Sequence, residues 1–280
     1  MWEVERVLGA NVAMMWPRRG TFPTGMTYAR LGDGPTTLLW LAAATRGPML
    51  AMMARAVRPF VAAGYTVWLV SVRPNMPTGH TLEDMADDYA RLIDEEFGGH
   101  VDLVIGHSNG GMIGFCLAAR HPDRFGHIVI AEAGLWSERL DRANLDSARL
   151  LVTGHTRQGG ALMIRFIAPN LRLPGVVPVL GALIGRATLA EYGDDLLVVA
   201  EAIHAFDPQE ILPNIAVPVL LVGGENDVLF AQEELERAAQ LIPQGTLRHY
   251  PGTNHFGTIT SPRFAADTHD FIRQHQQTTA

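Results

Sequence analysis

The chain has 280 residues, of which 48% are apolar and 18% charged, and its formal net charge is −7. This composition excludes an intrinsically disordered chain, and the length suffices for one large domain or two small ones with a sizeable core. The acidic balance argues against a nucleic-acid partner, because neutralising phosphates requires clustered basic side chains.

Three features of the sequence bear on where the protein works. The single cysteine, Cys116, excludes an internal disulfide and fits a reducing compartment. The first residues, MWEVERVLGA, carry acids where a secretory signal carries bases. The longest apolar region, Ala161–Gly185, is interrupted by two arginines, three prolines and several glycines, so we expect no membrane span. The sequence therefore predicts a cytoplasmic protein.

Short apolar runs alternate with helical patterns along most of the chain. Trp2–Val7 and Met26–Arg30 are expected as antiparallel edge strands, joined by a loop rich in Gly, Pro and Arg. The further expected strands are Thr37–Leu41, Tyr65–Val70, Val101–Ile105, His127–Ala131, Pro218–Val222 and Thr246–Tyr250. The expected helices are Pro48–Ala63, Thr81–Phe97, Asn109–Arg120, Ala231–Leu241 and Pro262–Gln274. Continuous apolar strands are buried on both faces, so the pattern predicts an α/β fold with a mostly parallel central sheet flanked by helices.

The alternation is interrupted between residues 138 and 204. Helices without a convincing strand between them are expected over Leu140–Thr153, Gly160–Ile167, Pro178–Leu183 and Thr188–Phe206. The strand pattern then resumes. We therefore interpret residues 138–204 as a helical cap inserted over the carboxyl edge of the sheet, and residues 1–137 and 205–280 as the core.

The strongest chemical signal is the run GHSNG at residues 106–110, between an expected strand and an expected helix. A serine at such a sharp strand-to-helix turn is held in a strained conformation with its hydroxyl exposed. Side chains two residues before and after it would collide as the helix folds back, which explains Gly106 and Gly110. Ser108 is the candidate nucleophile, and the competing interpretation is an incidental serine in a glycine-rich turn.

A serine hydroxyl needs a base to take its proton and an acid to orient that base. Asp227 follows the strand Pro218–Val222, and His255 follows the strand Thr246–Tyr250. The carboxyl ends of parallel strands share one edge of a sheet, so Ser108, Asp227 and His255 can converge there.

Other carboxylates and histidines compete for these roles. Glu225 and Glu132 are alternative acids, whereas we interpret His107 and His204 as structural histidines. The remaining histidines show no metal-ligand spacing, and a single cysteine excludes a thiolate site. We therefore expect neither a metal nor a cofactor.

The chain resembles the α/β-hydrolase superfamily of serine hydrolases over residues 26–272. The resemblance is carried by the segments TYARLGDGP, GHSNGG, ARHPDRF, PVLLVGGENDVL and YPGTNHF, and by the chain order serine, aspartate, histidine. It implies the core sheet fold, a helical cap between the sixth and seventh strands, Ser108 as nucleophile, Asp227 as acid and His255 as base. It leaves the substrate open, because this fold hosts many chemistries.

One segment departs from the superfamily's pattern. After the third strand its members usually carry a His-Gly pair, followed by a residue whose amide N–H helps to form the oxyanion hole, whereas residues 41–45 read LAAAT here. Any non-proline residue has an amide donor, so we assign the hole to the N–H groups of Ala44 and Asn109, with Ala43 as a near alternative. The missing glycine restricts the loop, and the missing histidine removes a usual support of it.

The cap supplies the only clue to the substrate. Sixteen of the 25 residues in Ala161–Gly185 are apolar. Some of them must pack on the core, but an apolar roof over the serine favours an apolar acyl or alcohol group. We expect Trp136, Phe166 and Leu183 to contact the substrate.

Together these features predict a serine hydrolase of carboxylic esters or lactones of modest size and apolar character. The expected partner is this small molecule, with no nucleic acid and no membrane. A thioesterase and a hydrolase of carbon–carbon bonds would use the same three residues. A ligand-binding receptor with vestigial hydrolysis is the alternative from another functional class.

Overall fold

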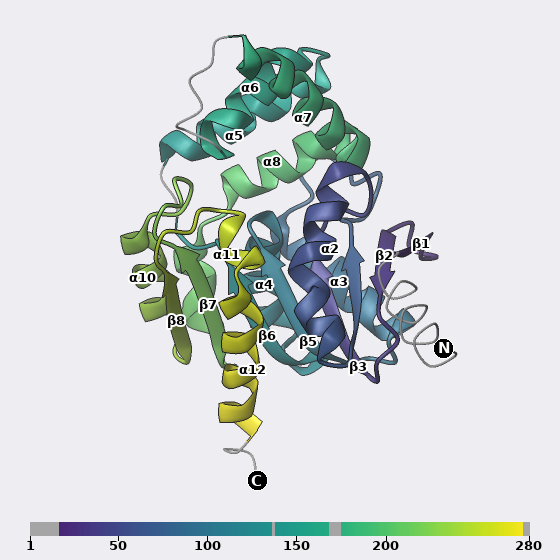
Figure 1. Ribbon diagram of the computed structural model, residues 1–280, viewed down its shortest axis with the longest axis vertical. Coiled ribbons are helices and arrows are strands. Elements are labelled where there is room, and N and C mark those ends of the chain that lie inside the picture. Colours follow the sequence, from purple (N-terminus) through teal and green to yellow (C-terminus); the bar gives the residue numbers. More distant parts are fainter. Residues whose placement is uncertain (1–16, 136–137, 168–174, 277–280) are drawn as a thin grey trace, which may run out of the picture.

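The computed structural model describes residues 17–135, 138–167 and 175–276. Their centre is an eight-stranded sheet of order β1-β2-β4-β3-β5-β6-β7-β8, in which β2 runs antiparallel to both of its neighbours, β1 and β4, and all other neighbouring strands pair in parallel (Figure 1). The strands are β1 (Arg18–Thr21), β2 (Thr27–Leu31), β3 (Thr36–Leu41), β4 (Tyr65–Val70), β5 (Val101–His107), β6 (Phe125–Ala131), β7 (Val219–Gly224) and β8 (Gly245–Tyr250). The predicted α/β fold is confirmed.

Helices cover both faces of the sheet. They are α2 (Gly47–Ala62), α3 (Leu82–Glu96), α4 (Asn109–Arg120), α9 (Pro208–Ile211), α10 (Gln232–Leu241), α11 (Gly257–Thr260) and α12 (Pro262–Gln276), with 3-10 turns η1 (Pro122–Arg124) and η2 (Leu212–Asn214). Alternate residues of β3 point to the two faces of the sheet. Leu38 and Trp40 belong to the apolar cluster that includes residues of α2 and α12. Leu39 and Leu41 belong to the apolar cluster that includes residues of α3, α4 and α10. The strands are therefore buried on both sides, as their unbroken apolar runs predict.

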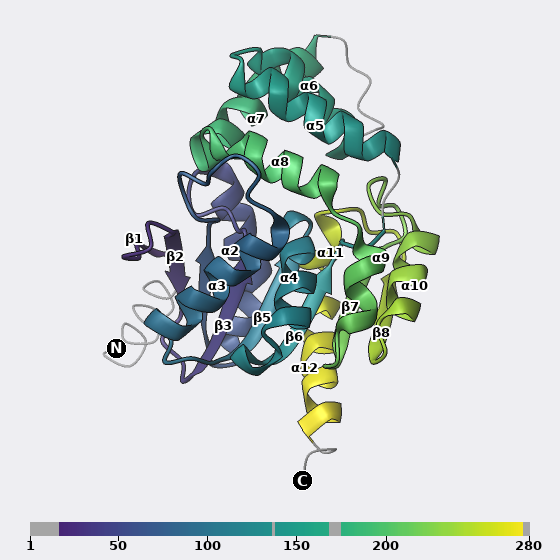
Figure 2. The ribbon, with the colours of Figure 1, turned by 180° about the vertical axis from the view of Figure 1, so that it is seen from behind.

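Four helices follow β6 and lie beyond the end of the sheet where the parallel strands finish (Figure 1, Figure 2). They are α5 (Glu138–Val152), α6 (Thr156–Ile167), α7 (Val176–Tyr192) and α8 (Asp195–Ala205), and we call them the cap. The sequence placed a break between Leu183 and Thr188, but α7 runs through it without interruption. Close packing explains the glycines there, because a Cβ added at Gly160 of α6 would lie 1.8 Å from the carbonyl oxygen of Gly181.

The antiparallel edge of the sheet differs from the prediction. The expected strand Trp2–Val7 lies outside the described residues. Strand β1 falls instead in the stretch expected to be a loop, and pairs with β2 through Arg18 opposite Arg30 to Thr21 opposite Thr27. The side chains of β1 are mostly exposed, so its sequence carries no apolar pattern. Gly20 makes room for the side chain of Tyr28, whose hydroxyl oxygen would lie 2.4 Å from a Cβ at that position.

The structure also bears on membrane insertion. Within the described part of the chain, no helix combines the length and the apolar character needed to cross a bilayer.

Candidate active site

Ser108 occupies the turn between β5 and α4, with a backbone φ of 55° and ψ of −120°. A positive φ is unfavourable for a residue with a Cβ, and the surrounding packing must enforce it. A Cβ at Gly106 would lie 2.3 Å from the carbonyl oxygen of Gly110, and a Cβ at Gly110 would lie 2.2 Å from that of Leu41. The expected collision between strand and returning helix is thus seen for Gly106, whereas Gly110 is required by the close approach of the end of β3. The Ser108 hydroxyl does not cap α4.

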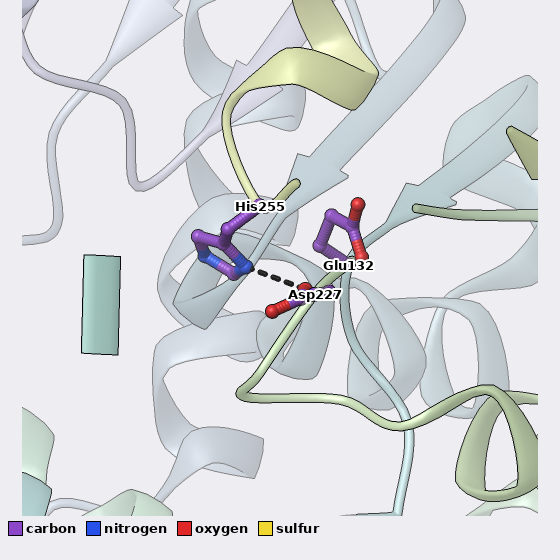
Figure 3. A group of neighbouring side chains, drawn as sticks. All are labelled: Glu132, Asp227 and His255. Atoms are coloured by element: carbon purple, nitrogen blue, oxygen red, sulfur yellow. Dashed lines mark hydrogen bonds and ion pairs between the residues drawn. The ribbon is translucent and has the colours of Figure 1, made fainter. Parts of the chain in front are cut away.

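His255 and Asp227 form a buried pair. Nδ1 of His255 lies 2.8 Å from Oδ2 of Asp227, and the two side chains are 6% and 0% exposed (Figure 3). Oδ1 of Asp227 accepts a hydrogen bond of 2.8 Å from the N–H of Leu229. Burial alone would raise the pKa of Asp227, but the hydrogen bond and charge of His255 hold that pKa below its ordinary value. An ionised Asp227 keeps the proton of His255 on Nδ1 and leaves Nε2 as the basic nitrogen.

His107 joins the serine turn to the histidine loop. Its Nε2 lies 2.9 Å from the carbonyl oxygen of His255, and the two rings are 4.8 Å apart. Burial lowers the pKa of His107 to about 3, so the neutral ring donates its Nε2 proton to that carbonyl. Because His107 directly precedes Ser108, this hydrogen bond brings the serine turn next to the loop that carries His255. This contact agrees with the structural role expected for His107.

A second buried carboxyl group, that of Glu132, lies beside Asp227 (Figure 3). Its Oε1 accepts hydrogen bonds from the N–H of Gly224, at 2.8 Å, and from the hydroxyl of Thr258. Burial raises the pKa of Glu132, and the neighbouring Asp227 raises it further, which favours the protonated, neutral form of Glu132. By contrast, Glu225 is exposed and binds the N–H of Gly252 at 2.9 Å. His204 of α8 is also exposed.

Glu132, Asp227 and His255 each offer a metal-ligand atom, and these atoms lie within 4.8 Å of one another. Hydrogen bonds engage Oε1 of Glu132, Oδ1 of Asp227, and the pair of Oδ2 of Asp227 with Nδ1 of His255, whereas Oε2 of Glu132 has no hydrogen-bond partner among the described residues. The donor set therefore fits an acid paired with a histidine better than a metal site.

The loop after β3, residues 42–46, carries the proposed oxyanion donor. Ala42 has a φ of 48°, so an alanine adopts the left-handed conformation that glycine takes more readily. Its N–H donates to the hydroxyl of Tyr89 at 2.8 Å, and this hydroxyl donates to the backbone carbonyl groups of β4 and Ser71. The N–H of Ala43 donates to the carbonyl oxygen of Val70 at 2.9 Å. The near alternative, Ala43, therefore has its donor engaged.

The N–H groups of Ala44 and Asn109 are differently placed. Within the described residues, no acceptor lies at hydrogen-bond distance from the N–H of Ala44, whereas the next N–H, that of Thr45, donates to Glu191 at 3.0 Å. Asn109 is the first residue of α4, where the N–H groups have no partner within the helix. Both donors are thus available to a substrate oxygen.

The residues expected to contact substrate are only partly described. Trp136 lies outside the described residues, as does the side chain of Phe166, although its backbone belongs to α6. Leu183 of α7 is 59% exposed, so the described part of the chain does not enclose it in a pocket.

A cavity of about 640 Å³ lies between the cap and the ends of β2 and β4, lined among others by Thr27, Ser71, Glu191 and Tyr192. Ser108, Asp227 and His255 do not line it. The side chain of Tyr192 interacts with that of Asn109, so Tyr192 borders both the cavity and the serine turn.

Comparison with known proteins places this arrangement in a family. The chain is 28% identical over 191 residues to the provisionally named carbamate hydrolase RutD of Caulobacter sp. strain K31, covering 65% of this chain and 69% of that protein. It is also 28% identical over 199 residues to the 2-(acetamidomethylene)succinate hydrolase of Mesorhizobium japonicum, covering 66% and 68%. A thermophilic esterase from Thermogutta terrifontis has a similar fold, with a TM-score of 0.70 at 19% identity over 92% of this chain and 98% of that one. The family model of the alpha/beta hydrolases matches residues 32–268, and the chain therefore belongs to the alpha/beta hydrolase family.

Proposed function

We propose that the protein is a serine hydrolase that cleaves carboxylic esters or lactones of modest size and apolar character. The observation that carries the proposal is the buried pair of His255 and Asp227, 2.8 Å apart, together with a serine held at a φ of 55° whose preceding residue, His107, hydrogen-bonds to the His255 carbonyl. A strained serine at a strand-to-helix turn and a histidine whose Nδ1 is engaged by an aspartate are the parts that nucleophilic catalysis needs.

The proposed reaction proceeds through an acyl-enzyme. Nε2 of His255 takes the proton of Ser108 as its oxygen attacks the substrate carbonyl carbon, and ionised Asp227 stabilises the imidazolium that forms. The N–H groups of Ala44 and Asn109 stabilise the negative oxygen, and His255 then protonates the departing alcohol. A water molecule that gives its proton to His255 next attacks the acyl carbon, which releases the acid and restores Ser108.

Carbamates are a second candidate substrate class. The relative in Caulobacter is named for carbamate hydrolysis, and the same steps cleave a carbamate, whose carbonyl carbon is also attacked by the serine. An ester, a thioester and a carbamate with one shared acyl or alkyl group therefore belong in the first substrate panel. The class with the highest kcat/KM identifies the bond that this site prefers.

Covalent labelling tests the nucleophile. A fluorophosphonate probe should label the protein once, at Ser108, and Ser108→Ala should abolish the label. The same substitution should lower ester turnover by about 10³- to 10⁶-fold, because the three residues act as a unit. Undiminished labelling of Ser108→Ala at another site would refute the assignment. A probe-reactive protein without turnover of any panel substrate would favour the ligand-binding receptor.

A further inference from the structure

One carboxylate of the cap, that of Glu191, binds the loop of residues 42–46, which carries the proposed oxyanion donor and which we call the oxyanion loop. Glu191, the last residue but one of α7, accepts hydrogen bonds on Oε1 from the N–H of Thr45 at 3.0 Å and from the Thr45 hydroxyl at 2.9 Å. The Thr45 hydroxyl also lies 2.8 Å from that of Thr27 in β2. The Glu191 side chain is 8% exposed and Thr45 is 3% exposed. Hydrogen bonds to a carboxylate in such a buried place are stronger than those between neutral groups.

The next residue of the cap contacts the other half of the proposed oxyanion hole. The hydroxyl of Tyr192 lies 3.5 Å from the carbonyl oxygen of Ala42, and the Tyr192 side chain interacts with that of Asn109. Two consecutive residues at the end of α7 therefore touch both segments from which the oxyanion donors come.

The geometry of the loop shows what this contact achieves. The N–H of Ala43 is bound by Val70 on one side of Ala44, and the N–H of Thr45 is bound by Glu191 on the other side. The peptide group that carries the N–H of Ala44 is thus held between two fixed neighbours. Without Glu191 only the first of these anchors remains, in a loop already strained by the positive φ of Ala42.

We propose that Glu191 is a positioning residue that fixes the oxyanion loop from the cap, so that the N–H of Ala44 points at the reacting carbonyl oxygen only while α7 is docked on the core. It takes over the loop support that the missing histidine would provide. The inference rests on the proposed function, because it requires Ala44 to be an oxyanion donor. It gives Glu191 at the end of α7, and not the cap as a whole, a role in positioning the oxyanion donor.

Two variants of Glu191 test the proposal. Glu191→Ala should lower kcat for an ester about 10- to 100-fold with little change in KM, because losing one oxyanion donor outright costs roughly 10²- to 10³-fold. Amide hydrogen exchange in the peptide that covers residues 42–46 should become faster in the same variant. Glu191→Gln keeps an oxygen that can accept from Thr45, so it should recover most of both losses.

Asp195 of α8 provides a matched control. Its carboxylate also binds two backbone N–H groups of the core, those of Asn75 at 2.9 Å and Met76 at 2.8 Å, away from the oxyanion loop. Asp195→Ala should leave kcat and the exchange of residues 42–46 close to their unmutated values. An equal loss of kcat in Asp195→Ala and Glu191→Ala would overturn the proposal, since any loosening of the cap would then suffice.

Two further results would also overturn it, and both differ from a failure of the proposed function. Faster loop exchange in Glu191→Ala with unchanged kcat would show that the loop does not serve the reaction. Unchanged loop exchange would show that Glu191 does not hold the loop. If the unmutated protein neither hydrolyses esters nor is labelled at Ser108, the proposed function is wrong, and loop exchange alone decides whether Glu191 is the anchor.

Discussion

The two buried carboxyl groups beside His255 have pKa values shifted in opposite directions because their surroundings differ. Asp227 receives the His255 ring and the Leu229 N–H, which stabilise its ionised form. Glu132 is fully buried next to Asp227, and two like charges so close together are unfavourable. Surroundings that shift two pKa values in opposite directions indicate which carboxyl group is ionised. We therefore expect Asp227 to orient the base and Glu132 to stay neutral behind it.

Replacement of the acid tests this assignment. Asp227→Asn should keep the fold and lower kcat about 10⁴-fold, because a neutral amide no longer selects the Nδ1–H tautomer of His255. Glu225→Gln makes the same chemical change on an exposed side chain that binds only the next loop, so its activity should stay near that of the unmutated protein. A mild Asp227→Asn together with a severe Glu132→Gln would reassign the acid to Glu132. The test measures kcat for one ester in each variant, and circular dichroism shows whether each variant is folded.

The protonation of Glu132 predicts how stability depends on pH. Its pKa is raised in the folded protein, so the unfolded chain loses this proton at lower pH than the folded chain does. Its contribution to stability is therefore complete at acid pH and is lost as the pH rises above the ordinary glutamate pKa. Glu132→Gln has no proton to lose and should gain stability relative to the unmutated protein between pH 5 and pH 8.5, by at most about 1.4 kcal/mol per pH unit.

Urea unfolding at these two pH values measures that gain. Glu225→Gln serves as the control, because it makes the same chemical change on an exposed side chain. A gap between Glu132→Gln and the unmutated protein that stays constant with pH would mean that Glu132 is ionised in the folded state.

At the scale of elements, the sequence predicts best what local patterns determine. Helix α4 spans Asn109–Arg120 as expected, and α3 opens on a capping box, in which Thr81 and Asp84 bind each other's N–H groups at 2.9 and 3.1 Å. Strand β1 was missed because only its pairing with β2 makes it a strand. The length of α7 was missed because the glycines that normally weaken a helix serve here for contact with α6.

The α6–α7 contact gives an element-scale prediction. A Cβ at Gly160 would stand 1.8 Å from a backbone oxygen of α7, so Gly160→Ala should destabilise the cap by about 1–3 kcal/mol, although alanine favours helices. Gly175→Ala is the matched control, since Gly175 has a φ of −80° and open space around it. Thermal unfolding of both variants distinguishes packing from propensity. A higher Tm for Gly160→Ala would show that the two helices are not in contact.

At the scale of the whole molecule, contacts between distant residues complete the candidate site. The sequence predicts Ser108, Asp227 and His255 from the ends of expected strands and from motif spacing, because both are visible in short stretches of the chain. The bond between Thr45 and Glu191 joins residues 146 positions apart, and that between Glu132 and Thr258 joins residues 126 positions apart. No periodicity links such pairs, so only the folded chain brings them together. Through Glu191 and Asp195 the cap is tied to the loops that follow β3 and β4.

An exposed apolar stripe on α7 of the cap leads to a prediction about the length of the substrate's acyl chain. Val176, Val179 and Leu183 are 46%, 61% and 59% exposed, and their spacing of three and four residues places them in one stripe along α7. If substrate chains bind along this stripe, kcat/KM should rise from acetyl to butyryl to hexanoyl esters. Each buried methylene contributes about 0.8 kcal/mol, nearly fourfold, until the available surface is covered.

Leu183→Gln should flatten this rise while a small fluorophosphonate still labels Ser108 at the unmutated rate, because the change lies on the exposed stripe of α7. Arg186→Gln, an exposed polar change on the same helix, should leave the chain-length profile as it is. Steady-state kinetics on the acyl series for the three proteins, with a melting temperature for each, makes the comparison. A lowered Tm with an unchanged profile in Leu183→Gln would mean that the leucine serves packing alone. A flat profile in the unmutated protein would contradict an apolar acyl site and direct the search to small polar esters, lactones or carbamates.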